Sequence, residues 1–319
     1  MPSPIDVLCA GIVVADHVCT PVSHLPSAGE LVMADDMLLT IGGCAANAAV
    51  DLAKMGVRAA VVGRVGADVC GRVVTGMLDE AGVDASAITA STTAPTSQTL
   101  IVNVQGEDRR FIHTFGANAE FAAADIPWRL IEQCKVLYVG GYLLMPGMRQ
   151  EDLAPVFARA RARGVKTVLD VAIPAPGEYV GRLEKLLPHV DAFLPNQHEG
   201  EIITGRSDPV AQAEFFQGLG CGSTIITMGG GGAVLVQPGR RLRCGVYTVP
   251  YVDGSGGGDA FDAGYIYAIL HGMEPEDALR VASALGASCV RAIGTTPGVF
   301  TRAECEAFLQ EQSLRIEAV

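Results

Sequence analysis

The stretch Val252–Gly264, VDGSGGGDAFDAG, decides the fold most directly, because a run of small residues passes straight into a predicted helix. Four of the five residues from Gly254 to Gly258 are glycine. Without Cβ atoms at the helix start, the free N–H groups and the positive end of the helix dipole form a concave site suited to phosphate. Asp259 follows in the first turn, where a carboxylate can accept the proton of a hydroxyl that attacks phosphorus. A helix-capping Asp259 beside a flexible turn is the plainer interpretation of the same residues.

Outside this stretch, short apolar runs rich in β-branched residues alternate with alanine-rich segments of helical period. This alternation is typical of parallel strands joined by crossover helices, so the sequence predicts an α/β fold. Most of the strands are too apolar to leave one face in water, so both faces of the sheet should be covered. The predicted strands are 5–13, 59–65, 136–139, 166–169, 192–194, 224–227 and 233–236, and the predicted helices are 45–54, 71–80, 153–163, 211–217, 259–271 and 275–290.

Two stretches, 14–40 and 94–116, interrupt the alternation. The second contains TSQTLIVNVQGEDRRFIHTFG, which predicts two antiparallel strands around a turn at 105–108. Because such a hairpin has no crossover helix to cover it, we expect a small β lid that stands apart from the main sheet, with an added strand at the sheet edge as the alternative. One lid face should bury against the substrate-filled cleft or a second subunit, and we expect a homodimer. The α/β domain would then comprise 1–13, 41–93 and 117–319.

Composition limits the classes of function. The 319 residues are 49% hydrophobic and carry 35 acidic against 23 basic side chains, for a formal net charge of −12. This field repels nucleic acid and anionic membrane surfaces, so we expect neither as a partner. The start MPSPIDVLCAG has no basic flank, no apolar run is long enough for a membrane span, and nine dispersed cysteines form no CxxC pair. A reduced, cytoplasmic protein is expected.

The common alternative phosphate and metal motifs are missing. The chain contains no Gly-Lys dipeptide for a Walker A loop and no GxGxxG dinucleotide motif, and His198-Glu199 is followed by Ile202 in place of the second histidine of a zinc-protease motif. These absences exclude the corresponding sites.

A second glycine-to-helix segment is IGGCAANAAVDLAKMG, at 41–56. Asn47 lies in its first turns beside Gly42 and Gly43, and an asparagine there can offer both a donor and an acceptor to a polyol hydroxyl. Asp16 follows the first predicted strand, at the strand end where open α/β sheets bind ligands. The plainer interpretations are a core helix after a Gly-Gly turn and a solvated loop aspartate.

Together these segments resemble the ribokinase-like (PfkB) carbohydrate kinase family, and the resemblance covers nearly the whole chain. GGCAANAA at 42–49 and DGSGGGD at 253–259 resemble the two family signatures. The shorter matches are GIVVADH at 11–17, GANAEF at 116–121, LPNQHEGEIITG at 194–205 and TMGGGGAVL at 227–235. The resemblance implies a three-layer fold with a central, mostly parallel sheet and a small β lid. It also implies transfer of the γ-phosphate of ATP to a hydroxymethyl group of a sugar-like acceptor.

The resemblance further implies roles for individual residues. Asp259 would be the general base, and the amides of Gly256, Gly257 and Gly258 would form an anion hole for the transferring phosphoryl group. The acceptor would be bound by Asp16, Gly42, Gly43 and Asn47, and the nucleotide by Asn196, Thr227, Gly229 and Gly232. Asn196 and Glu199 would organise Mg²⁺, and Asp253, Ser255 and Gly294 would hold a K⁺ ion.

Departures from the family pattern bear on the acceptor. This chain has Val14 where ribokinases commonly carry Asn and Cys44 where they carry Lys, so ribose itself is not the expected acceptor. Gly254 replaces a frequent Thr, and Gly230 and Gly231 stand where a polar or basic residue is common in the nucleotide loop.

Three other functions stay open at this point. A nucleoside kinase would need an apolar slot for the base, for which Phe111, Phe115, Phe121 and Tyr142 are candidates. A phosphosugar kinase would need a basic pocket, for which Arg109, Arg110 and Lys54 are candidates. A non-catalytic ligand-binding regulator of the same fold would carry a damaged catalytic loop, whereas Asp259 and its glycines are present.

Overall fold

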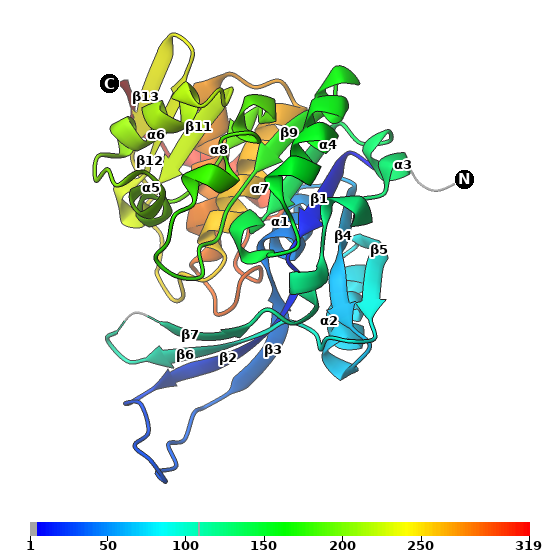
Figure 1. Ribbon diagram of the computed structural model, residues 1–319. Coiled ribbons are helices and arrows are strands. Elements are labelled where there is room, and N and C mark those ends of the chain that lie inside the picture. Colours follow the sequence, from blue (N-terminus) through cyan, green and yellow to red (C-terminus); the bar gives the residue numbers. More distant parts are fainter. Residues whose placement is uncertain (1–4, 108) are drawn as a thin grey trace.

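The computed structural model describes residues 5–107 and 109–319 (Figure 1). Its main sheet has ten strands in the order β14-β13-β12-β11-β10-β9-β8-β1-β4-β5. Pairing is parallel from β5 to β11 and antiparallel from β11 to β14, so the predicted mostly parallel sheet is confirmed. The strands are β1 Val7–Gly11, β4 Ala59–Gly66, β5 Asp84–Ser91, β8 Val136–Gly140, β9 Lys166–Leu169, β10 Ala192–Phe193, β11 Ser223–Thr227, β12 Ala233–Gln237, β13 Arg240–Cys244 and β14 Ile316–Ala318.

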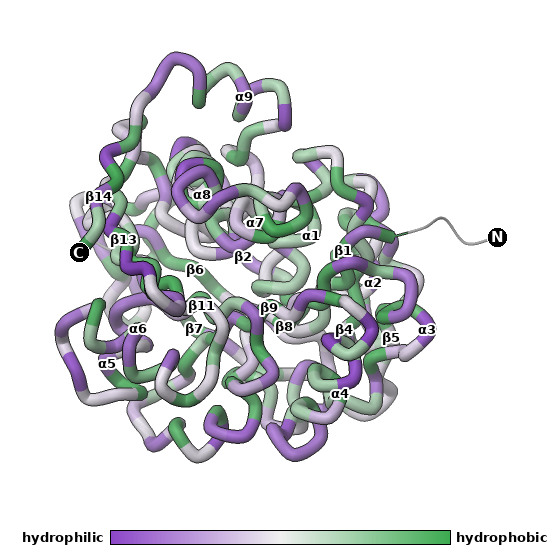
Figure 2. Tube along the Cα trace, turned by 90° about the horizontal axis from the view of Figure 1, so that it is seen from above, coloured by the Kyte–Doolittle hydropathy of each residue, from purple (hydrophilic) through white to green (hydrophobic). Residues whose placement is uncertain are grey.

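Helices cover both faces of this sheet. Figure 2 shows α1, α7 and α8 on one side of the central strands and α4, α5 and α6 on the other. Alternate residues of β1 divide between the two layers, since Val7 and Cys9 join the core beneath α1, α7 and α8, and Leu8 and Ala10 join the core beneath α4 and α6. The helices are α1 Cys44–Lys54, α2 Val69–Glu80, α3 Trp128–Ile131, α4 Gln150–Ala162, α5 Gln197–Thr204, α6 Pro209–Gly218, α7 Gly257–Leu270, α8 Pro275–Cys289 and α9 Arg302–Glu311.

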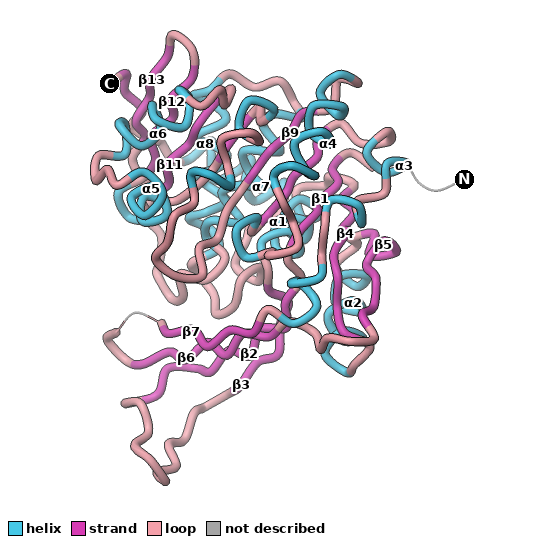
Figure 3. Tube along the Cα trace, in the orientation of Figure 1, coloured by secondary structure: helices cyan, strands magenta, loops and turns pink. Residues whose placement is uncertain are grey.

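The predicted lid is a separate sheet in the order β3-β2-β6-β7, with β2 Val14–Val22, β3 Met37–Gly42, β6 Gln98–Val104 and β7 Arg110–Thr114. Figure 3 shows this sheet projecting away from the main one. β6 and β7 pair antiparallel, so the hairpin is confirmed and the alternative of an added edge strand is wrong. The turn predicted at 105–108 includes Asp108, which lies outside the described residues. The domain boundaries drawn from the sequence stay a prediction.

The two faces of the lid sheet differ. The register aligns Asp16 with Thr99 and Thr99 with His113, and Asp16 and Thr99 are buried. The next row along, on the opposite face, pairs Leu100 with Ile112, and Ile112 is 67% exposed. The lid therefore turns its polar row toward the main domain and an apolar row outward. No helix in the described part of the chain is both long and apolar enough to cross a membrane.

Candidate active site

The predicted acceptor and catalytic residues come together where α1 and α7 begin. Asn47 Nδ2 donates a hydrogen bond to Asp259 Oδ2 at 2.7 Å, although the two residues are 212 positions apart in the sequence. The two glycines before α1 are required by close approach. A Cβ on Gly42 would lie 2.1 Å from Asp16 Oδ2, and Gly43 has φ +92° with Ile12 O 2.4 Å from its would-be Cβ. These glycines allow the Asp16 carboxylate and the start of α1 to share one space.

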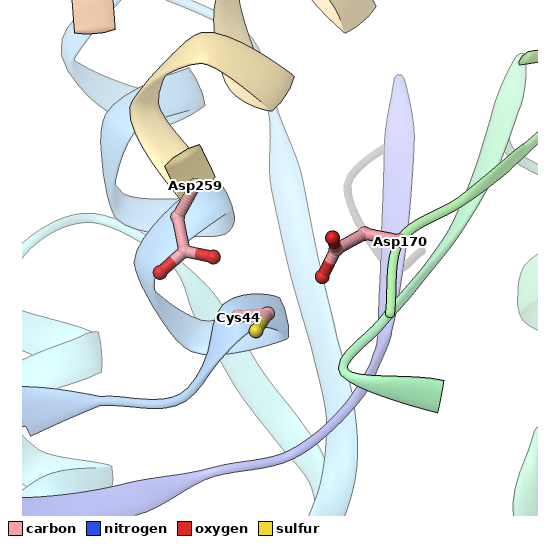
Figure 4. Close-up of side chains that lie close together, drawn as sticks. All are labelled: Cys44, Asp170 and Asp259. Atoms are coloured by element: carbon pink, nitrogen blue, oxygen red, sulfur yellow. The ribbon is translucent and has the colours of Figure 1, made fainter. Parts of the chain in front are cut away.

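Asp259 faces two further side chains that belong to other elements. Figure 4 shows Cys44 at the start of α1, Asp170 just after β9 and Asp259 in α7 with their ends turned toward one another. Their sulfur and oxygen atoms all lie within 4.8 Å of one another. Removal from water raises the pKa of Asp259, and hydrogen bonds from Asn47 and Cys44 oppose that rise by favouring the carboxylate. The carboxylate is therefore held in a poorly solvated place by specific donors.

Asp170 was missed by the sequence analysis. Burial and the nearby Asp259 raise its pKa to about 8, while the backbone N–H of Gly141 donates to its Oδ2 at 3.1 Å. The signal that points to it is its position directly after the predicted strand 166–169, at the strand end where ligands bind in such sheets. Burial and Asp259 likewise raise the pKa of Asp16 to about 7, against a hydrogen bond from Thr99. Asp170 and Asp259 thus share one small space with Cys44, and Asp16 lies near enough to respond to the charge of Asp259.

The glycines before α7 adopt the conformation expected of an anion site. Gly256 precedes the helix with φ +76°, and a Cβ on it would lie 2.2 Å from Thr295 O, so no other residue fits. Gly257 and Gly258 form the first turn of α7, where backbone N–H groups have no partner within the helix. Three predicted anion-hole glycines therefore lie next to Asp259.

The residues proposed for K⁺ also lie together. Asp253 Oδ1 accepts hydrogen bonds from Ser255 N and Ser255 Oγ, both at 2.9 Å, and Asp253 Oδ2 accepts one from Gly294 N at 3.0 Å. The buried Asp253 carboxylate thus joins the loop before α7 to the loop after α8.

The residues predicted for Mg²⁺ and the nucleotide lie at the start of α5 and after β11. Asn196 Oδ1 accepts from Glu199 N at 3.0 Å and Glu199 Oε2 accepts from Asn196 N at 2.9 Å, a reciprocal helix cap. The backbone of Asn196 also pairs with that of Thr227 in an isolated parallel β-bridge. Removal from water, with the charges of Asp170 and Asp259 nearby, raises the pKa of Glu199 well above its usual range. A divalent cation with oxygen ligands would relieve this repulsion, so the donor set fits Mg²⁺.

The glycine loop after β11 is open to solvent. Gly229 is exposed with φ +52°, and nothing lies within 4 Å of its would-be Cβ. Gly232 differs, because a Cβ on it would lie 2.0 Å from Cys244 O. The loop combines an open outer part with one fixed glycine against β13.

Several candidates for other acceptors are engaged elsewhere. Phe121 and Tyr142 are fully buried in the core, and Tyr142 Oη donates to Arg182 O at 3.0 Å. Lys54 Nζ donates to the backbone carbonyl of Thr296, and Arg110 pairs with Glu107.

Of the three remaining candidates, Phe115 packs edge-on against His113, with ring centres 5.7 Å apart, and Arg109 and Phe111 belong to the lid hairpin. Arg109 Nη2 donates to Gly254 O at 3.2 Å, and its guanidinium lies 5.4 Å from the ring centre of Phe111. The lid therefore contacts the loop that leads into the anion-hole glycines.

Comparison with known sequences identifies this arrangement. The sequence model described as pfkB family carbohydrate kinase matches residues 5–302. The chain belongs to this family. The resemblance drawn from the motifs is confirmed, and the pfkB carbohydrate kinases account for the three-layer fold and the lid.

The relatives of this pfkB kinase are named for different acceptors. A ribokinase of Haemophilus influenzae is 26% identical over 305 residues, which cover 94% of this chain and 97% of the relative. A 2-dehydro-3-deoxygluconokinase of Bacillus subtilis is 28% identical over 284 residues, which cover 85% of this chain and 87% of the relative. The acceptor has to be argued from the residues of this pfkB chain.

Solved structures share the fold over nearly the full length. Thermotoga maritima ribokinase has a TM-score of 0.80 at 25% identity and covers 97% of this chain and 100% of its own. Arabidopsis thaliana ribokinase complexed with ribose and ATP has a TM-score of 0.81 at 23% identity and covers 97% and 99%. An E. coli putative ribokinase II in complex with ATP and Mg²⁺ has a TM-score of 0.82 at 20% identity and covers 97% and 100%.

Proposed function

We propose that this pfkB kinase transfers the γ-phosphate of ATP to a hydroxymethyl group of a sugar, with Asp259 as general base. The observation that carries the proposal is the position of Asp259. It stands in the first turn of α7, beside the left-handed Gly256, and is hydrogen-bonded to Asn47 on the acceptor side. A carboxylate placed there can meet a hydroxyl on one side and a phosphoryl group on the other.

In the proposed reaction, the acceptor oxygen forms a bond to the γ-phosphorus while the bond from that phosphorus to the bridging oxygen of ATP breaks. The hydroxyl proton passes to Asp259, and ADP leaves. The N–H groups of Gly256, Gly257 and Gly258 would stabilise the charge on the phosphoryl oxygens. Mg²⁺ bound with ATP would neutralise phosphate charge, and Asn196 and Glu199 would orient it and its waters.

The acceptor side favours a neutral sugar. Asp16, Asp170 and Asp259 contribute carboxyl groups to it, and such groups exchange hydrogen bonds with sugar hydroxyls but offer no positive charge to an acidic substrate. The core positions of Phe121 and Tyr142 remove two of the four side chains considered for a nucleoside base. We therefore propose a neutral sugar ahead of a nucleoside, a sugar acid or a phosphosugar.

Two further elements of the proposal concern K⁺ and the oligomer. Asp253, Ser255 and Gly294 are the proposed K⁺ site. The outward face of the lid presents Met37 and Ile112, 65% and 67% exposed, and a second copy of the chain would cover them in a homodimer. Light scattering of wild type and an Ile112→Glu variant tests the homodimer, which the variant should weaken.

The test of function is an ATP-consumption screen with Mg²⁺, in K⁺ and in Na⁺, across pentoses, hexoses, ketohexoses, nucleosides, sugar acids and sugar phosphates. We expect one or more neutral sugars to give phosphorylated product, identified by ³¹P NMR, and Asp259→Asn to lose it. Turnover of a sugar acid or nucleoside alone would overturn the proposed acceptor class. Binding of a sugar without any turnover would favour the non-catalytic regulator.

A further inference from the structure

We propose that Thr295 is a positioning residue that aligns the base Asp259 through Asn47. This inference rests on the proposed function, because it concerns the residue named there as general base. Thr295 lies in the loop after α8, and its hydroxyl makes hydrogen bonds to Asn47 Oδ1 and Ile41 O.

Asn47 has both ends of its amide engaged. Its Nδ2 donates to Asp259 Oδ2 at 2.7 Å, and its Oδ1 accepts from Thr295 Oγ1 at 2.9 Å. Asn47 is 2% exposed and Thr295 4% exposed, so water does not compete at this point. An amide turned the other way would set its oxygen against the Asp259 carboxylate. The Asp259 carboxylate requires the amide nitrogen on its side, and the Thr295 hydroxyl, whose single proton is shared between Asn47 Oδ1 and Ile41 O, supports the same orientation by donating to the amide oxygen.

Thr295 is itself held from several sides. Its Oγ1 also lies 2.8 Å from Ile41 O, at the end of lid strand β3, and its carbonyl accepts from Cys289 Sγ at 3.1 Å. The same carbonyl is the atom that a Cβ on Gly256 would meet at 2.2 Å. Thr295 thus lies where the lid, the anion-hole turn and α1 meet.

The neighbouring backbone fixes the loop to α1. Lys54 Nζ, at the end of α1, donates to Thr296 O at 2.5 Å and to Val299 O at 3.3 Å. Gly294 N donates to Asp253 Oδ2 on the other side of Thr295. Because the backbone is anchored on both sides, removal of the Thr295 hydroxyl should disturb Asn47 more than the course of the loop.

The donor from Asn47 matters because the surroundings of Asp259 oppose its charge. The groups near enough to influence it electrostatically are Asp16, Cys44, Asp51, Tyr138, Asp170, Glu199, Asp262 and Cys289. Removal from water is the main influence that opposes the charge of Asp259, whereas the hydrogen bonds from Asn47 and Cys44 favour it. The hydrogen bond from Asn47 stabilises the charged form of Asp259 and keeps it available as a base. A loosely held Asn47 would stabilise the carboxylate less.

The experiment compares Thr295→Val, which keeps the shape and loses the hydroxyl, with Thr295→Ser, which keeps the hydroxyl. Titration of the Asp259 carboxyl carbon is followed by NMR in ¹³C-aspartate-labelled protein, with Asp259→Asn used to assign the signal. We expect Thr295→Val to raise the titration midpoint by about half to one pH unit. Thr295→Ser should titrate near wild type. Thr296→Val, one residue along the loop, is the matched control and should not move the midpoint.

Turnover gives the second readout. With an acceptor from the screen, the acidic limb of the kcat profile should move upward in Thr295→Val by the same amount as the NMR midpoint, with little change in KM. An unchanged midpoint in Thr295→Val would overturn the proposal. A Thr295→Ser variant whose midpoint rises as much as that of Thr295→Val would overturn it too. If Thr295→Val does not fold, Thr295→Ala makes the same test without a second methyl group. Because the NMR titration needs no acceptor, a failed acceptor screen would count against the proposed function and leave this test intact.

Discussion

The proposed acceptor side and the proposed nucleotide side of the site are constructed differently. On the acceptor side, Asn47 and Asp259 are joined by a hydrogen bond between α1 and α7, and Asp16 reaches the same space from the lid. On the nucleotide side, Asn196 and Glu199 bond to each other at one helix start, and Gly229 lies exposed. The first arrangement needs contacts between distant segments, whereas the second is local.

This difference separates two kinds of contribution to catalysis. A base and its donors that are fixed before the substrate arrives need little reorganisation during the reaction. An exposed loop with open space around it can adapt to its ligand, so we expect it to contribute mainly to binding. Changes on the acceptor side should therefore reduce turnover, and changes on the nucleotide side should raise the ATP or Mg²⁺ concentration that is needed.

Asp259→Asn should have the largest effect. We expect turnover to fall by roughly 10²-fold or more, because an amide cannot take up the proton of the sugar hydroxyl. ATP binding, measured by calorimetry, should change little, since the anion-hole backbone keeps its conformation. Turnover within a few-fold of wild type would show that Asp259 is not the base.

Gly232→Ala should weaken ATP binding, with KM for ATP raised about 10-fold and kcat less affected. The alanine Cβ would meet Cys244 O at 2.0 Å, so the loop after β11 must move. Gly239→Ala is the matched control, because Gly239 also has positive φ, +74°, but has nothing within 4 Å of its would-be Cβ. Equal effects of the two variants on KM would mean that backbone strain alone is responsible.

Much of the fold could be predicted because its signals are local. The buried strands are continuous apolar runs, so β1, β4, β8, β9, β11 and β12 were found near their observed bounds. β13 was missed, since its sequence RRLRC carries three arginines and reads as surface. α5 was also missed, because eight residues give little periodicity and its cap, Asn196 with Glu199, was interpreted as a nucleotide and metal motif.

The site divides in the same way. Gly43, Gly232 and Gly256 could be found because a glycine run before a helix or strand is visible in the sequence, and all three have positive φ. Thr295 could not, since its hydrogen bond to Asn47 spans 248 positions and no local pattern encodes it. Residues that act through distant partners require the folded chain.

Glu199→Gln should have a smaller effect, confined to Mg²⁺. Glutamine keeps an oxygen for Asn196 N, so the helix cap remains while the charge that orders the metal's waters is lost. We expect half-maximal activity to need several-fold more Mg²⁺. Glu201→Gln, on the exposed side of the same helix, should leave the Mg²⁺ titration unchanged. Superposable titrations of Glu199→Gln and wild type would reduce Glu199 to a helix cap.

Asp51 differs from the other carboxyl groups of the acceptor side because it lacks a hydrogen-bond donor among the described residues. Its substitution should have the smallest effect on activity and should act on stability instead. It lies one turn after Asn47 in α1, is fully buried, and neither carboxylate oxygen has a hydrogen-bond partner in the described part of the chain. Burial raises its pKa well above the usual range, against the attraction of Lys54 and with the repulsion of Asp259. A folded pKa above the unfolded one means that the folded state binds more protons, so stability is greatest below the unfolded pKa of about 4 and is lost as pH rises toward the folded pKa.

Asp51→Asn removes this titration without a large change of shape. Between pH 5 and pH 7 the free energy of unfolding of wild type should fall relative to that of the variant, by at most about 1.4 kcal/mol for each pH unit. Urea denaturation of both proteins at pH 5, 6 and 7 measures the difference, and the other buried carboxyls cancel because both proteins contain them. Burial is the largest influence on this pKa and sets the sign, because the described residues provide no hydrogen-bond donor to either carboxylate oxygen. Parallel pH dependences of the two proteins would mean that Asp51 is ionised and paired in solution, and it would then not differ from the other carboxyl groups of the acceptor side.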